Sequence, residues 1–138
     1  MERRTRVPAD PNQLAVLNQF LRDFWSTAGL APAGMQPFEL ALEEIFMNVV
    51  MHGSEPDRTP WVEVCLDGGA AESVTMTVED DGPQFDPLSL SPPDLSAGLD
   101  QRPVGGLGVF LVRQMMDTVS YQRVGTRNQL RMTKTLAR

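Results

Sequence analysis

The order of elements expected along this chain of 138 residues is that of a single α+β domain. Apolar residues recur at helical spacing in two segments near the N-terminus. Two pairs of alternating segments, typical of β-hairpins, come later, with one further helix between the pairs. The sequence contains no internal repeat, so the domain is expected to span residues 1–138.

One strand and one helix are expected first. Residues 1–7 can form a short edge strand, which the segment from Pro8 to Pro11 ends. Asp10 is a suitable N-cap, and Pro11 suits the first helical position after it. The helix is expected to run up to Gly29, because large apolar residues recur at helical spacing: Leu14, Leu17, Leu21 and Phe24.

A second helix is expected from residues 34–37 to about Gly53 and is apolar nearly all round, which is typical of a buried helix. Three polar residues, Glu44, Asn48 and His52, lie at i, i+4 and i+8 and therefore share one face. A buried carboxylate without partners is costly, so this polar line is expected to face a cleft that holds water, metal or ligand. The competing interpretation is a helix with one solvated edge.

Two residues of this helix also have simpler interpretations. Glu43 lies about 100° round the helix from Glu44 and is expected on a solvated or sheet-side edge. His52 is the only histidine of the chain. A histidine near a helix C-terminus more often complements the helix dipole than acts as a catalyst.

A loop over residues 54–60 leads to the first pair of strands. Residues 61–66 alternate, with Val62, Val64 and Leu66 on one side. A turn at residues 67–69 and a second alternating segment at residues 73–78 complete a hairpin with a longer loop.

The acidic turn Asp80-Asp81-Gly82 follows the second of these strands. Acidic residues with glycine and proline after a strand normally just form a turn. A carboxylate at a strand end can also accept a hydrogen bond from an exocyclic amine such as that of adenine. Gly82 would then let the backbone approach the flat base closely.

A glycine turn opens the third helix, which is expected from about residue 108 to residue 117. Its glycines are Gly105, Gly106 and Gly108, and residues 87–104 before them form a long loop without periodicity. Free N–H groups at the start of a helix bind phosphate, and glycine permits close approach. The competing interpretation is an ordinary tight turn, because the residues of a P-loop or a dinucleotide fingerprint are missing.

Two strands, near residues 119–124 and 129–136, are expected to close the chain. Residues 125–128 contain glycine and asparagine, which are typical of the turn between two strands. The strands of the domain are thus expected in two pairs, separated by the third helix.

Composition argues against several classes of partner. The formal net charge is −6, which disfavours binding to a nucleic-acid backbone. Cys65 is the only cysteine, so no internal disulfide can form, which fits a reducing compartment. There is no signal-peptide core, and no run approaches the ~18 apolar residues of a membrane span. We therefore expect a cytoplasmic protein that contacts neither membrane nor nucleic acid.

Taken in order, these segments resemble the N, G1 and G2 boxes of the GHKL ATP-binding superfamily. Within it, the chain most resembles the anti-sigma-factor serine kinases, which are stand-alone histidine-kinase-like ATPase domains. The resemblance covers nearly the whole chain and rests on residues 42–53, 80–87 and 105–111, with residues 128–130 near its end. It implies a Bergerat-type fold, a two-layer α/β sandwich with a mixed, mostly antiparallel sheet and helices on one face.

The resemblance also implies roles for the site residues. Glu44 would be the general base that activates the attacking hydroxyl, and Asn48 would hold Mg²⁺ bound to the phosphates of ATP. Asp80 would bind the adenine amine, with Gly82 beside the base. Asn128 stands where many relatives have a threonine near adenine. The phosphates would contact Gly105, Gly106 and Gly108, and residues 87–104 would form the ATP lid.

Members of this family phosphorylate a serine on a small anti-anti-sigma partner of the STAS type. In another state they hold a sigma factor, and they form homodimers. The alternative is a nucleotide-dependent protein-binding module without kinase activity, although Glu44 favours the kinase because a pure binder needs no base. A detached catalytic domain of a histidine kinase is disfavoured by the short lid and by the lack of a phosphoacceptor-helix segment.

Overall fold

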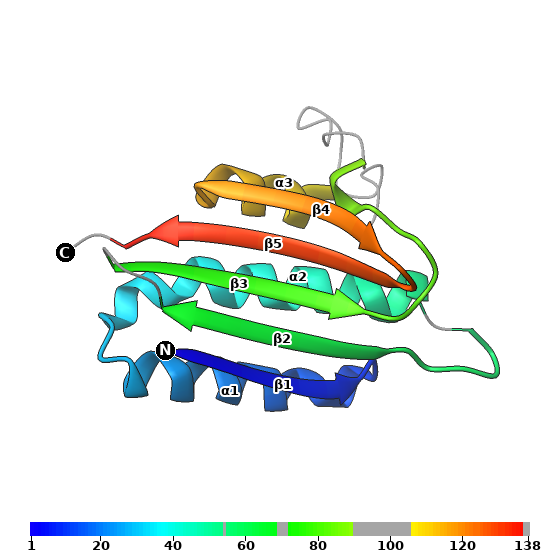
Figure 1. Cartoon of the computed structure of the whole chain (residues 1–138), viewed down its shortest axis with the longest axis horizontal. Coiled ribbons are helices and arrows are strands. Elements are labelled where there is room, and N and C mark those ends of the chain that lie inside the picture. The colour runs from blue at the N-terminus through cyan, green and yellow to red at the C-terminus, as the bar shows by residue number, and fades with distance from the viewer. Residues whose placement is uncertain (54, 69–71, 90–105, 137–138) are drawn as a thin grey trace.

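The protein folds into two layers, a β-sheet and a layer of helices on one of its faces (Figure 1). The computed structural model describes residues 1–53, 55–68, 72–89 and 106–136. Among these residues, five strands form one sheet in the order β1-β2-β3-β5-β4. The predicted two-layer α+β sandwich is confirmed.

The N-terminal elements follow the predicted pattern. β1 (Glu2–Pro8) is an edge strand that pairs antiparallel with β2. The Asp10 carboxylate accepts a hydrogen bond from the Asn12 backbone N–H at 2.9 Å and caps a 3-10 turn, Pro11–Gln13. α1 (Leu14–Thr27) continues from this turn.

The second helix, α2 (Gln36–Gly53), is preceded by a 3-10 turn, Pro32–Met35. Its apolar side chains pack into the core, where Phe38, Leu42 and Phe46 are fully buried. The helix lies between α1 and α3, behind the middle of the sheet (Figure 1). α2 is therefore the central helix of the domain, and its burial forces any polar residue on it towards an opening.

The central hairpin consists of β2 (Trp61–Gly68) and β3 (Ser73–Asp80), which pair antiparallel. Alternate residues of both strands face the helices and are fully or almost fully buried: Val62, Val64, Leu66, Val74, Met76 and Val78. Asp80 continues this alternation, so its side chain also points to the helix layer at the last position of β3.

The C-terminal part contains α3 (Gly106–Met115), β4 (Thr118–Val124) and β5 (Arg127–Thr135). β5 pairs antiparallel with both β3 and β4. The expectation of a mixed sheet was wrong in this detail, because every pairing between the described strands is antiparallel. The reason is that the β4–β5 hairpin inserts its second strand beside β3.

Two predicted boundaries also need correction. α3 begins at Gly106, so the glycine turn is itself the first turn of the helix. Asn128 does not lie in a turn, because the turn is confined to residues 125–126, where Gly125 has φ +59°. Asn128 is therefore a strand residue, directly opposite Asp80 in the β3–β5 register.

The predicted lid over residues 87–104 falls mostly outside the described residues, as does Gly105. Its first part is described and forms a 3-10 turn, Pro87–Ser89. None of the described helices combines the length and the apolar character needed to cross a bilayer.

Candidate functional site

The three polar residues on one face of α2 differ in how far they are exposed to solvent. The Glu44 side chain is half-buried, Asn48 is 3% exposed, and His52 is exposed near the last turn of the helix. Burial raises the pKa of Glu44, and the neighbouring charge of Glu43 raises it further. Glu43 itself is exposed, as expected. The predicted arrangement on one helix face is thus present, and its middle residue is the most buried.

Glu44 faces the first turn of α3. A Cβ atom added to Gly108 would overlap the carboxyl group of Glu44. The Glu44 carboxyl group can occupy this space only because position 108 has no side chain. The first N–H groups of a helix have no partner within it, so this turn offers donors that the helix itself does not use beside the carboxyl group. An anion bound to those donors would lie close to Glu44.

Asp80 is buried at the end of β3, with 7% of its surface exposed. Its Oδ1 atom accepts hydrogen bonds from the Gly82 backbone N–H at 2.9 Å and from Asn128 Nδ2 at 3.0 Å. Burial raises the pKa of Asp80, although these two hydrogen bonds and the charge of Arg123 oppose the shift. Both hydrogen bonds go to one oxygen, which leaves Oδ2 of the carboxylate as the acceptor for a ligand.

The two aspartates of the acidic turn have different surroundings. Asp81 accepts a hydrogen bond from the Trp61 backbone N–H at 2.8 Å and forms an ion pair with Arg58. It therefore fastens the loop before β2, whereas Asp80 faces the helix layer. Asp80 is the last residue of β3, whose alternation directs its side chain to the helix layer, and Asp81 is the first residue after the strand.

Gly82 lies against the C-terminus of α2. A Cβ atom added at this position would be 3.1 Å from Asp80 Oδ1 and 3.4 Å from the Cα atom of Gly53. The backbone carbonyl of Gly82 accepts a hydrogen bond from Arg123 Nη1 at 2.9 Å. The turn after β3 is thus held closely against α2 by a glycine on each side.

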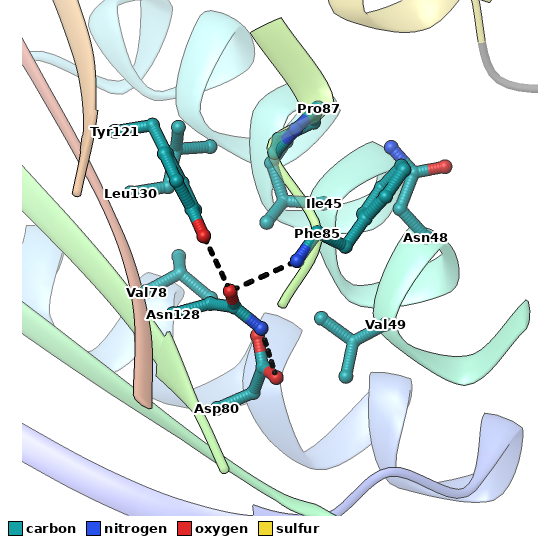
Figure 2. Close-up of a pocket in the computed structure, with 10 residues that line it drawn as sticks. All are labelled: Ile45, Asn48, Val49, Val78, Asp80, Phe85, Pro87, Tyr121, Asn128 and Leu130. Carbon is teal, nitrogen blue, oxygen red and sulfur yellow. Dashed lines mark hydrogen bonds between the residues drawn. The ribbon is translucent and has the colours of Figure 1, made fainter. Parts of the chain in front are cut away.

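Asp80, Asn48 and Asn128 meet at one pocket (Figure 2). Apart from these polar residues and Tyr121, the lining is apolar: Ile45, Val49, Val78, Phe85, Pro87 and Leu130. The free space is about 20 Å³, room for one water molecule. Apolar walls around one carboxylate suit a flat, mostly apolar ring that carries an amine, provided that the wall formed by Phe85 and Pro87 moves outward.

Phe85 and Tyr121 belong to the pocket although the sequence suggested no role for either. Figure 2 shows that the Phe85 N–H and the Tyr121 hydroxyl both point to the side-chain oxygen of Asn128. The Phe85 ring also stacks on His52, with ring centroids 4.4 Å apart. Phe85 could have been noticed because it follows the acidic turn, whereas Tyr121 has no local signal beyond its place in a strand.

Asn48, the residue expected to hold magnesium, has a buried side-chain amide. Its Nδ2 atom is buried and has no hydrogen-bond partner among the described residues. Within the same residues, no cluster of three histidine, cysteine or acidic side chains could hold a metal alone. Mg²⁺ typically takes one or two protein oxygens together with substrate phosphates. The side-chain oxygen of Asn48 could be such a ligand, and its unpaired Nδ2 atom, which can only donate, would then be available to an acceptor such as a phosphate oxygen.

Comparison with known proteins also points to an ATPase-type domain. The family described as the histidine kinase-like ATPase domain matches residues 7–134. Serine-protein kinase RsbW of Bacillus subtilis (strain 168) is 28% identical over 121 residues, which cover 85% of this chain and 75% of RsbW. Serine/threonine-protein kinase BtrW of Bordetella bronchiseptica is 32% identical over 115 residues, or 82% of this chain and 75% of BtrW.

A solved structure shares the fold. It is the histidine kinase domain of a blue-light activated histidine kinase from Erythrobacter litoralis EL346, with a TM-score of 0.59 and 16% sequence identity. The match covers 94% of this chain and 62% of the other, and at this identity it concerns the fold alone. The expected family is confirmed by the match over residues 7–134: this chain belongs to the histidine kinase-like ATPase domain family.

Proposed function

We propose that this chain is an ATP-dependent protein serine/threonine kinase. The observation that carries the proposal is the position of the Glu44 carboxyl group against Gly108, in the first turn of α3. A base and a set of free N–H donors thereby lie side by side, next to a pocket with a buried carboxylate. The names of the relatives RsbW and BtrW, both protein kinases, support the same activity.

The base of ATP is proposed to bind at Asp80. The free oxygen of that carboxylate would accept a hydrogen bond from the adenine amine, and Gly82 would allow the backbone to lie beside the ring. Asn128 forms the adjoining wall and belongs to the same binding site. Because the pocket is smaller than a purine, the segment that carries Phe85 must move when ATP enters.

The phosphates are proposed to bind at the start of α3. Backbone N–H groups of Gly106 and Gly108, together with Gly105, would contact their oxygens, because the first turn of a helix offers unpaired donors. Asn48 would hold Mg²⁺, with the phosphates supplying further ligands. When bound, the ion would neutralise charge on the transferring phosphoryl group.

Glu44 is proposed to act on the protein substrate. Its carboxylate would take the proton from the serine hydroxyl while the serine oxygen bonds to the γ-phosphorus and the bond to the β–γ bridging oxygen breaks, releasing ADP. A positioned carboxylate base contributes typically ~10²–10⁴-fold. The half-buried position of Glu44 raises its pKa towards the range in which a base accepts protons well.

The protein substrate is proposed to be a small anti-anti-sigma protein of the STAS type. In its other state the chain would bind a sigma factor, and it would act as a homodimer. These partners rest on the resemblance of the three nucleotide-binding boxes to anti-sigma-factor kinases. The kinase relatives support the choice of a protein as phosphate acceptor.

The experiment is a transfer assay with Mg-ATP and the small STAS-type proteins encoded in the same genome. Phosphate on one serine of one of these proteins, located by mass spectrometry, is the expected result. Glu44→Gln is the matched negative control, because it keeps the size of the side chain and loses the base. If ATP binds but no candidate acquires phosphate, the nucleotide-dependent binding module replaces the kinase.

A further inference from the structure

Asn128 lies at the junction of three segments of the pocket. It is 6% exposed and pairs with Asp80 across the β3–β5 ladder and with Arg123 across the β4–β5 ladder. Its side chain lies in the helix-facing layer, between the end of β3 and the chain that follows it. The position is therefore suited to connect the base-binding carboxylate with the moving wall of the pocket.

The side-chain amide of Asn128 makes four hydrogen bonds within the protein, and Figure 2 shows three of them, those to Asp80, Phe85 and Tyr121. Its Nδ2 atom donates to Asp80 Oδ1 at 3.0 Å and to the Pro83 carbonyl at 2.8 Å. Its Oδ1 atom accepts from the Phe85 backbone N–H at 3.1 Å and from the Tyr121 hydroxyl at 2.6 Å. An asparagine side chain offers two donors and two acceptor sites, so all of them are used.

This pattern fixes the orientation of the amide. Exchanging its oxygen and nitrogen would set the new oxygen against Asp80 Oδ1 and the Pro83 carbonyl, which are both acceptors. The new nitrogen would face the Phe85 N–H, which can only donate. The amide therefore has a single acceptable orientation, and no hydrogen-bonding capacity remains for a nucleotide.

We propose that Asn128, itself held by Tyr121, is a positioning residue that aims the Asp80 carboxylate at the exocyclic amine of the base. This role rests on the proposed function: Asn128 would act on ATP through Asp80 and would not contact the nucleotide itself. The Nδ2 bond occupies Oδ1 and turns Oδ2 towards the ligand. The bonds to Pro83 and Phe85 tie the wall of the pocket to the same amide, so base selection and wall position depend on one side chain.

The test compares ATP with purine riboside triphosphate, which lacks only the exocyclic amine. The parent is expected to prefer ATP by about 10-fold or more, since one well-formed hydrogen bond to a charged group is lost with the amine. Asn128→Ala should weaken ATP binding more than binding of the amine-free nucleotide, because the loss of the wall bonds affects both and the loss of the bond to Asp80 affects ATP alone, so that the preference falls to about 3-fold or less. Affinities are measured by calorimetric or fluorescence titration.

Tyr121→Phe provides a second, milder variant. It keeps the ring in the pocket wall and removes only the hydroxyl that donates to Asn128 Oδ1. The preference for ATP should fall by about 3-fold, with a melting temperature close to that of the parent. Gln122→Ala on the same strand is the control, because Gln122 is exposed and bonds only Gln129 in the described structure; its preference should equal that of the parent.

The outcomes separate the two proposals. If both nucleotides weaken equally in Asn128→Ala and Tyr121→Phe, while the parent prefers ATP, Asp80 recognition stands and the positioning role is overturned. If the parent itself binds both nucleotides equally, the assignment of Asp80 to the amine fails and the positioning role fails with it. If the preference for ATP is lost only in Asn128→Ala and Tyr121→Phe, the result supports both recognition of the amine by Asp80 and the positioning role of Asn128.

Discussion

The carboxyl group of Glu44 lies in the space that a side chain at Gly108 would fill. Glu44 belongs to α2 and Gly108 to the first turn of α3, so this contact places the carboxyl group directly beside the start of α3. Inside a helix, alanine is more favourable than glycine by ~1 kcal/mol. Glycine at this position is therefore explained by the neighbouring carboxylate and not by helix stability.

Gly108→Ala should separate activity from stability. The added Cβ would displace the flexible end of the Glu44 side chain, and the cost should be largely offset by the better helix propensity of alanine. We expect a melting temperature near that of the parent and phosphoryl transfer lowered by about 10²-fold, because base and phosphate site are disturbed together. Thermal unfolding and single-turnover transfer are the two measurements.

Gly68→Ala is the control for this substitution. Its Cβ would lie 3.5 Å from Phe24 Cζ, an ordinary contact at the far end of β2. Stability and transfer should both remain close to the parent. Parental transfer by Gly108→Ala would contradict the assignment of this turn to the reacting phosphate.

Transfer should be lost in acid at a higher pH than an ordinary glutamate would give. Burial, and secondarily the charge of Glu43, raise the pKa of Glu44. Only the carboxylate accepts a proton, so the rate should rise as the pH increases through that raised pKa.

Glu43→Gln should move the acid limb of the rate profile to lower pH, because it removes a charge that raises the pKa of Glu44. Glu44→Gln should lower transfer by about 10²-fold while ATP binding stays nearly normal.

Single-turnover assays over a pH series, beside ATP titrations, measure both effects. If Glu43→Gln leaves the acid limb of the pH–rate profile at the same pH as in the parent, that limb reports a titrating group other than Glu44. Parental transfer by Glu44→Gln would remove Glu44 as the base and redirect attention to a different carboxylate, such as Glu43.

Asp80→Asn should stabilise the protein in the absence of ATP. Burial raises the pKa of Asp80, so the stability that this group contributes is complete below the ordinary aspartate pKa and is lost as the pH rises through the raised value. At neutral pH the buried charge is destabilising, and asparagine removes it while keeping an oxygen for Gly82 and Asn128. The melting temperature should therefore rise at neutral pH, and the difference should disappear in acid.

The same variant should bind ATP about 10-fold more weakly or worse, because an amide nitrogen can replace the free carboxylate oxygen next to the amine. Melting curves at several pH values and one ATP titration are sufficient. Lower stability than the parent at neutral pH would contradict the destabilising buried charge at Asp80, and unchanged ATP binding would contradict its assignment to the amine.

Asn48→Ala should remove the magnesium-dependent part of ATP affinity. The buried amide has an unpaired Nδ2 atom among the described residues, so its loss should leave the fold intact. With Mg²⁺ present, ATP affinity should fall by about 10-fold or more. With a chelator, parent and variant should bind ATP equally, and this titration serves as the internal control. An equal loss under both conditions would assign Asn48 to the nucleotide and not to the metal.

Much of the fold follows from local pattern. The bounds of α1, α2 and the four strands from β2 onward lie within a few residues of the predicted ones, because side-chain alternation and helical spacing act over short distances. The misplaced residue is Asn128. Asparagine is common in turns, yet the turn needs only two residues, Gly125 and the one after it. Pairing with β3 therefore extends β5 to include Asn128.

The sequence by itself determined which residues could form a nucleotide site: the polar line of α2, the acidic turn and the glycine turn are all short-range patterns. Tertiary structure alone decided how they act together. Alternation along β3 directs Asp80 to the helix layer, but only the packing of α2 against the sheet encloses it in a pocket. Asn128 bonds Asp80 across 48 residues of sequence, and Tyr121 joins them from a third strand. Such contacts depend on strand register and helix packing, which no local pattern encodes.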